Sequence, residues 1–197
     1  MGLSVKWTSC NLGASKTEEY GGYYQWGGLV DVTNTSINLD LTIVLSRPAR
    51  TIIPVGRNTY LQICPHIGPI QGDPDNKTIL DPEDDAAHFK LDNKWRIPTK
   101  EEFKELYNNC TSEHTTLNGV LGRKFTSKKN GNSIFLPVAG CRYFNILGSV
   151  NSYGMYWTLS LYSAAPYCAY SLLFCSDDVR TFQTSRWYGL SIRPVCD

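Results

Sequence analysis

Residues 99–110 carry the clearest helical pattern in the chain. Apolar side chains recur at the third, fourth and seventh positions after the first, which places them on one face of a helix. Thr99 begins the stretch and Glu102 stands three positions later, the capping-box arrangement typical of a helix start. Burial of each apolar side chain contributes about 1.5–3 kcal/mol, so we expect a scaffold helix. Its apolar positions are Phe103, Leu106, Tyr107 and Cys110.

Residues 80–89, LDPEDDAAHF, predict the start of another helix. Asp81 is suited to cap it, and Pro82 fits the first helical position. The acidic residues that follow favour the positive end of the helix dipole. Carboxylates are also hard ligands for calcium, but consecutive carboxylates on one turn point in different directions around the helix. We therefore expect no metal and no cofactor, and we interpret His88 as a packed surface residue.

Short alternating or apolar stretches predict β-strands elsewhere. Residues 2–7 and 189–194 are near-copies of one alternating pattern, GLSVKW and GLSIRP. Residues 18–28 combine aromatic residues with glycine pairs, which predicts a core aromatic strand. Residues 128–140 read as turns followed by a buried strand, with apolar residues at 134, 135, 136 and 138. Short strands together with two helices predict an α+β fold.

The stretch from residue 31 to residue 75 differs from the rest of the chain. β-rich runs there are interrupted by five prolines, and proline does not sit within central strands. We expect an irregular insertion with edge strands or a long arm, and we assign it no function.

Composition sets apart the C-terminal segment, residues 140–195. All ten lysines and all seven glutamates precede it, whereas seven of the twelve tyrosines lie inside it. Lysine and glutamate are the usual solubilising surface residues. A mixture of tyrosine with small polar residues is typical of antibody contact surfaces. Buried β-structure is the alternative, but glycines and a proline divide the segment into short pieces, which favours loops and brief strands.

Length and charge bound the remaining possibilities. A chain of 197 residues can bury about 70% of its unfolded surface, so we expect one domain, residues 1–197. The net charge is +1 with dispersed charges, which argues against nucleic-acid and membrane-surface partners. No apolar run is long enough to span a bilayer, and the N-terminus lacks the features of an export signal. The seven cysteines show no zinc-like spacing.

Several motifs resemble the variable proteins of diversity-generating retroelements. In the C-terminal segment these are YWTLS at residues 156–160, AYSLLF at 169–174 and RWYGLSIRPV at 186–195. Upstream, GLSVKWTSCNLGA, EEYGGYYQWG, LDPEDDAAH, WRIPTKEEF and NGNSIFLPVAG resemble the bacterial major paralogous domain of the Fibrobacter type. The resemblance covers nearly the whole chain and is weakest over residues 31–73. It implies a C-type lectin-like fold whose first and last strands pair, which would make Cys10 and Cys196 neighbours and a candidate disulfide.

The resemblance also implies a function. In diversified members, mutation of template adenines lets asparagine codons become many residues, but not Lys, Glu, Gln, Met or Trp. The chain would then be a receptor or adhesin domain whose variable surface recognises a protein or glycan, on a cell surface, in the extracellular space or on a phage virion. The alternative is a non-diversified surface or fimbrial module that binds a fixed glycan or protein. Oligomeric state stays open.

Enzymatic activity finds little support in the motifs. The formylglycine-generating enzymes share the lectin-like fold and use a cysteine pair just before a C-terminal Gly-x-Arg strand. The corresponding residues 185–193 read SRWYGLSIR, without cysteine. No nucleophile elbow, zinc-protease motif or phosphate loop is present either. We expect no catalytic residues.

Positions that vary in the family lie where the resemblance places the ligand. Each such residue in this sequence can arise from an asparagine codon. The expected ligand-binding residues are Tyr143, Phe144, Asn145, Ile146, Tyr153, Tyr167, Cys168, Ser171, Leu173, Cys175, Arg180, Phe182 and Tyr188.

Alternation within residues 169–175 divides that strand into two faces. The family motif fixes one set, so we expect Tyr170, Leu172 and Phe174 to be buried. The diversified set, Ser171, Leu173 and Cys175, is expected to be solvent-accessible.

Residues that asparagine codons cannot reach should belong to the constant frame. We expect Trp157 to lie in the core. Met155, Gln183 and Trp187 either belong to the frame or contradict diversification, and we assign Trp187 to the frame because it adjoins the fixed motif.

Overall fold

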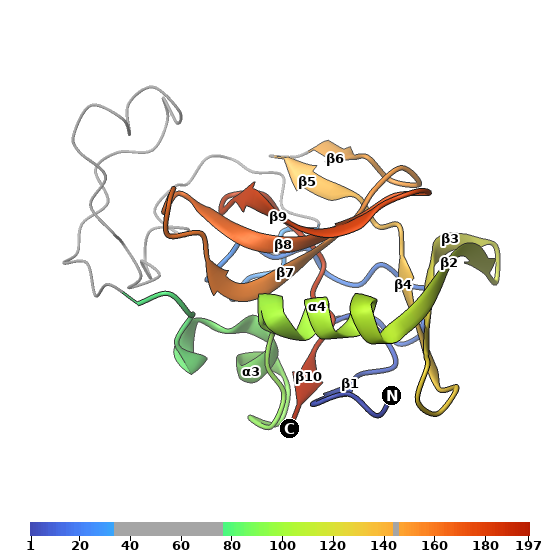
Figure 1. Cartoon of the computed structure of the whole chain (residues 1–197). Coiled ribbons are helices and arrows are strands. Elements are labelled where there is room, and N and C mark those ends of the chain that lie inside the picture. Colours follow the sequence, from blue (N-terminus) through green and yellow to red (C-terminus); the bar gives the residue numbers. More distant parts are fainter. Residues whose placement is uncertain (34–76, 144–145) are drawn as a thin grey trace.

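The computed structural model describes residues 1–33, 77–143 and 146–197 (Figure 1). Two α-helices and several short antiparallel sheets make up this part of the chain, which confirms the α+β class. Most of the expected insertion at 31–75 lies outside the described residues, as do Phe144 and Asn145.

The helix predicted by the capping box is α4, Lys100–Asn109. Both capping bonds form, with the Thr99 side chain accepting from the backbone N–H of Glu102 and the Glu102 carboxylate accepting from that of Thr99. Phe103 and Leu106 are fully buried. The helix ends one residue before Cys110, which is buried but begins strand β2.

The second helix begins later than predicted. Pro82–Asp84 form a 3₁₀ turn, η1, whose N-cap residue Asp81 makes no capping side-chain bond. The helix α3, Ala86–Lys90, is capped instead by Asp85, which accepts from the N–H groups of the second and third helical residues. Asp81 pairs with Lys77 at 2.6 Å. The prediction of Asp81 as the cap was therefore wrong.

Three strands form the central sheet in the order β7 (Gly154–Leu161), β8 (Cys168–Phe174) and β9 (Val179–Ser185). Helix α4 lies below this sheet in Figure 1. One face of the sheet joins the core cluster that contains Phe103 and Leu106 of α4. The opposite face joins a second cluster, to which residues near both ends of the chain contribute Leu12, Trp26, Leu190 and Ile192. The sheet is thus covered on both faces.

A second three-stranded sheet flanks the core, in the order β2 (Cys110–Leu117), β3 (Val120–Ser127) and β4 (Ser133–Pro137). β4 confirms the buried strand predicted within residues 128–140, since Phe135 and Leu136 in it, and Val138 just after it, are buried. A small hairpin follows, formed by β5 (Cys141–Tyr143) and β6 (Ile146–Gly148).

The two ends of the chain pair as predicted. β1 (Lys6–Trp7) and β10 (Val195–Cys196) are antiparallel, with Lys6 opposite Cys196. The two similar hexapeptides do not pair with each other, because Leu190 and Ser191 instead bridge to Tyr24 and Tyr156.

The candidate Cys10–Cys196 disulfide is not formed, since both thiols are free. The register of β1 and β10 places Cys196 opposite Lys6, four residues before Cys10. The Cys10 thiol instead donates to the carbonyl oxygen of Ala14.

The aromatic stretch at residues 18–28 belongs to the core, although only Tyr24 forms β-bridges there. Tyr23, Tyr24 and Trp26 are buried. The Trp26 indole donates to the carbonyl oxygen of Thr158 in β7, at 2.8 Å. Burial raises the pKa of Tyr24 to about 12.

Among the described residues, no helix is long and apolar enough to cross a membrane.

Candidate functional site

The C-terminal segment exposes several large apolar side chains. Tyr143 and Ile146 stand on the β5–β6 hairpin with Leu147, Tyr153 precedes β7, and Phe182 lies on β9. Ile146 is 62% exposed and Phe182 36% exposed. These residues come from the segment that lacks lysine and glutamate, so its aromatic side chains are partly surface and partly core.

An aromatic cluster joins the hairpin to the chain that follows β9. The Tyr143 ring lies 4.9 Å from the Trp187 ring and 5.1 Å from the Tyr188 ring, measured between centroids. The backbones of Arg142 and Gly189 exchange two hydrogen bonds of 2.7 and 2.9 Å beside it. This pairing holds the rings together although they are more than 40 residues apart in sequence.

Tyr188 anchors this cluster to the core. Its side chain is partly buried and packs against the cluster that contains Leu190 and Ile192. Burial raises the pKa of the Tyr188 hydroxyl, and neighbouring Cys141 and Tyr143 act in the same direction. Tyr143 is more exposed than Tyr188, so it forms the outer member of the cluster.

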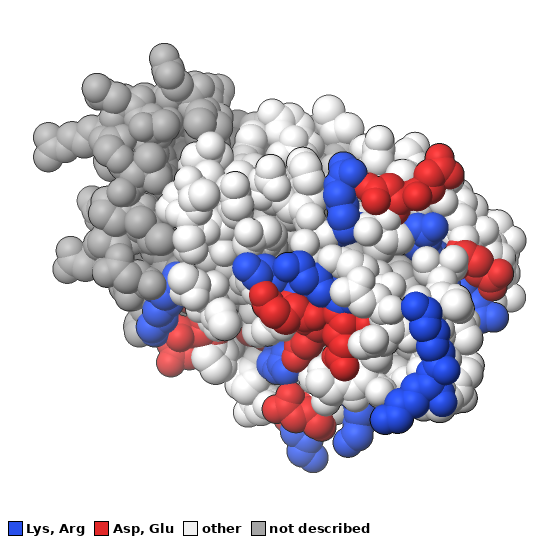
Figure 2. All heavy atoms as spheres, in the orientation of Figure 1, with Lys and Arg blue, Asp and Glu red and all other residues white. Residues whose placement is uncertain are grey.

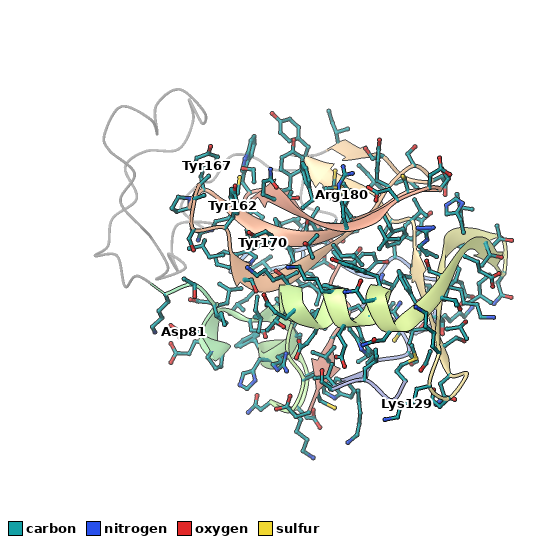
Figure 3. All side chains as sticks on the ribbon, viewed as in Figure 1. Asp81, Lys129, Tyr162, Tyr167, Tyr170 and Arg180 are labelled. Atoms are coloured by element: carbon teal, nitrogen blue, oxygen red, sulfur yellow. The ribbon has the colours of Figure 1, made fainter. Side chains whose placement is uncertain are left out.

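Arg180 and Phe182 form a second exposed group on the outer strand of the sheet. The Arg180 guanidinium lies 5.6 Å from the centre of the Phe182 ring, within cation–π range. Arg180 also pairs with Asp178. Figure 3 shows the Arg180 side chain on the upper side of the sheet, away from α4.

The predicted alternation in β8 is half right. Leu172 and Phe174 are buried against α4, as expected. Ser171 was predicted to be accessible but is fully buried, where its hydroxyl bonds the Thr184 hydroxyl at 2.8 Å. Its face carries the second core cluster, so it meets protein rather than solvent. Leu173 and Cys175 are intermediate in burial.

Two further predictions at the other end of β8 need correction. Cys168 was placed in the ligand surface but is buried, and burial raises the pKa of its thiol. Tyr170 was placed in the core but is only partly buried. Its ring lies at the N-terminal end of α4, where the Lys100 ammonium sits 4.3 Å from its centre and Tyr162 packs edge-on.

Tyr167 lies apart from the aromatic cluster, in the connection between β7 and β8 (Figure 3). Its carbonyl oxygen accepts from the backbone N–H of Arg186. Tyr162 stands in the same connection and was missed by the sequence analysis. The only sequence signal for Tyr162 is the tyrosine enrichment of the segment as a whole.

The residues expected to belong to the constant frame differ in burial. Trp157 is fully buried and its indole donates to the carbonyl oxygen of Tyr24, as a core residue should. Met155 is partly buried against the same core cluster. Trp187 supports the exposed ring of Tyr143. Gln183 is exposed on β9.

Charge is unevenly distributed over the visible face of the molecule. Figure 2 shows acidic and basic side chains around α4 and below it, and a further group of both signs at the upper right, whereas the described surface at the upper left is largely uncharged. The C-terminal segment as a whole offers exposed apolar area, hydroxyl groups and the ion pair of Arg180 with Asp178. Such a surface is suited to binding a partner by apolar packing and hydrogen bonding.

The described residues contain no group of three or more His, Cys, Asp or Glu side chains that could hold a metal ion. Asp85, from the acidic cluster considered for calcium, is buried. Its carboxylate accepts from three backbone N–H groups, those of Ala87, His88 and Ile97. Burial raises its pKa, against the opposing effect of these bonds.

No protein-family model, curated protein or solved structure matches the chain.

Proposed function

We propose that the chain is a ligand-binding receptor or adhesin domain with a C-type lectin-like fold, whose C-terminal surface a retroelement diversifies. Its ligand would be a protein or glycan on a cell surface or in the environment. The protein itself would act at a cell surface, in the extracellular space or on a phage virion. It would be a binding module without catalytic activity.

One observation carries this proposal. Within a segment that has no lysine or glutamate, the exposed positions include Tyr143, Ile146, Tyr153, Arg180 and Phe182, all residues that asparagine codons can reach. Side chains buried beneath them, such as Trp157, form a frame that could stay constant. Pairing of the two chain ends and the antiparallel sheets agree with a lectin-like architecture.

Burial removes Ser171 and Cys168 from the proposed binding surface, although both can arise from asparagine codons. The described residues that remain in the proposed surface are the exposed Tyr143, Ile146, Tyr153, Arg180 and Phe182 and the partly buried Tyr167, Leu173, Cys175 and Tyr188.

One observation favours the alternative, a module with a fixed protein or glycan ligand. Gln183 is exposed on β9 between Phe182 and the buried Thr184, yet adenine mutation of asparagine codons cannot produce glutamine. A fixed binding surface places no such restriction on the residue.

Sequencing the gene across a natural population tests between the two. Diversification predicts many amino acids at 143, 146, 153 and 182, with Trp157, Leu172 and Phe174 invariant. It also predicts a nearby reverse transcriptase gene and an adenine-rich near-repeat of the coding region. A uniform sequence with neither element in the flanking DNA would exclude diversification and leave the fixed module.

A further inference from the structure

Among the described residues, no strand pairs with the outer edge of β9 in the central sheet. β8 occupies the middle, and the outer edge of β7 is already paired, since Trp157 N–H donates to Ser191 O and Leu159 N–H donates to Pro98 O. β9 pairs only with β8 within the described chain. Figure 1 shows β9 at the upper border of the sheet.

The backbone bonds at the ends of the β8–β9 ladder fix which groups face outward. Arg186 N–H donates to Tyr167 O at one end, and Cys175 N–H donates to Asp178 O at the other. Hydrogen-bonded and non-bonded pairs alternate along an antiparallel ladder. Arg180, Phe182 and Thr184 therefore bond β8, while the backbone groups of Val179, Thr181 and Gln183 point away from it.

This edge has few of the features that keep sheet edges from associating. β9 is seven residues long, reads VRTFQTS and keeps an unbroken register with β8. It contains no proline, no lysine and no bulge, the usual protective devices. The Thr181 and Gln183 backbones have no hydrogen-bond partner outside the ladder in the described part of the chain.

We propose that β9 pairs with β9 of a second copy of this chain, antiparallel and about a two-fold axis through Thr181. The axis makes Thr181 face Thr181 of the second copy, and Val179 face Gln183. About six backbone hydrogen bonds then form between the copies, and two three-stranded sheets become one of six strands.

Two-fold axes through Arg180 or through Phe182 would pair the outward-facing backbone groups of β9 less favourably. An axis through Arg180 sets the two Arg180 guanidinium groups opposite each other. An axis through Phe182 needs the carbonyl of Ser185, which already accepts from Tyr188 N–H at 3.1 Å. The axis through Thr181 needs neither.

The Thr181 axis also brings complementary side chains together. It sets Arg180 directly opposite Phe182 of the second copy, in non-hydrogen-bonded pairs, where side chains approach most closely. Arg180 and Phe182 already lie within cation–π range of each other in one chain. Repeating this contact across the axis favours a second copy as the occupant of the edge.

The inference goes beyond the proposed function and does not depend on it. Backbone bonds carry most of the pairing, and the contact between Arg180 and Phe182 adds to it in this chain. The exposed residues outside the pairing, Tyr143, Ile146 and Tyr153 of each copy, would then be present twice in one dimer, which raises the avidity for repeated ligands.

Sedimentation equilibrium of the full chain over a range of concentrations tests the dimer. The wild-type protein should reach twice the chain mass of 22.1 kDa. Thr181→Pro removes an outward N–H without touching the β8 ladder, and should weaken dimerisation about tenfold or more. Thr181→Val keeps the N–H and a similar volume, so it is the matched control and should dimerise like wild type.

Charge variants test the axis itself. Thr181→Lys and Thr181→Glu should each be largely monomeric, because like charges meet on the axis. An equal mixture of the two should form a heterodimer that salt weakens. Circular dichroism and thermal melting verify that each variant is folded.

Three results would overturn the proposal. A wild-type chain that stays monomeric at every concentration excludes the dimer. A dimer that folded Thr181→Pro leaves intact excludes the β9 edge. A mixture of the lysine and glutamate variants that does not associate excludes the axis through Thr181.

Discussion

Trp157 links the central sheet to the N-terminal part of the chain. It is fully buried, and its indole N–H donates to the carbonyl oxygen of Tyr24, 133 positions earlier. Trp157→Ala should lower the free energy of unfolding by about 3–5 kcal/mol, because it leaves a cavity and removes one of the two hydrogen bonds that the Tyr24 carbonyl accepts, the other coming from Leu190 N–H. Urea unfolding measures this. A loss below about 1 kcal/mol would mean that Trp157 is not the core residue described.

Tyr153 provides the matched contrast, four residues earlier on an exposed site. Tyr153→Ser should change the free energy of unfolding by less than about 1 kcal/mol, while Phe182→Ser and Tyr143→Ser should behave similarly. Affinity for any ligand found should fall strongly in these variants, because exposed aromatic residues often carry about 2 kcal/mol or more each at an interface. Unfolding of all three variants would identify these rings as core instead.

Residue-scale predictions from sequence succeeded where one side chain is constrained by its neighbours in sequence. The capping pair Thr99 and Glu102 lies within one turn and forms as predicted. For the other helix the sequence predicted Asp81 as the cap, but Asp85 caps it. The second carboxylate oxygen of Asp85 also accepts from the distant backbone N–H of Ile97, which holds this side chain in place. That contact has no signature in the local sequence.

At the scale of elements, the start of α4 should respond to pH. Burial would raise the pKa of Glu102, but the hydrogen bonds from Arg96 and from Thr99 N–H outweigh it and lower the pKa below its ordinary 4.5. The ionised carboxylate therefore stabilises the fold above about pH 4.5. This contribution is lost as the pH falls through the lowered pKa.

Glu102→Gln keeps the size and the capping geometry while removing the charge. At pH 7 it should cost about 1–2 kcal/mol, because the bonds from Arg96 at 2.7 and 2.8 Å lose their ionic partner. The difference from wild type should shrink progressively below pH 4.5. Urea unfolding at pH 7 and pH 3 measures both values, and an equal difference at both pH values would contradict the assignment.

Element-scale prediction failed where a face is covered by irregular chain. Alternation in β8 separated Leu172 and Phe174 from Ser171 and Leu173, and that separation is real. A period of two gives the residues that share a face, but not whether that face meets solvent. The covering layer comes from loops near both chain ends, with Trp26 and Leu190 among its residues. Loops carry no periodic signal, so Ser171 was wrongly placed at the surface.

At the scale of the whole molecule, Arg193 ties separate parts of the chain together. It is fully buried and donates to Asn11 Oδ1 at 2.8 Å, Thr8 O at 3.2 Å and Phe135 O at 2.9 Å. Burial lowers the pKa of its guanidinium to about 10, which keeps it charged at neutral pH.

Arg193→Met should therefore destabilise the protein by about 3 kcal/mol or more, because buried acceptors on different segments lose their donor together. Arg193→Lys keeps the charge but not the planar fork, and should recover only part of this loss. Thermal unfolding gives the comparison. A methionine variant as stable as wild type would show that these segments are held by apolar packing alone.

Pairing of β1 with β10 places both ends of the described chain on the same side of the molecule. Both chain ends lie at the lower pole in Figure 1, whereas the β5–β6 hairpin and β9 lie at the upper pole. A carrier, a bead or a biosensor chip attached through either end would thus leave the aromatic surface turned outward. The fold therefore fixes the orientation of the proposed ligand-binding surface in a display experiment, and the chain can be attached through either end.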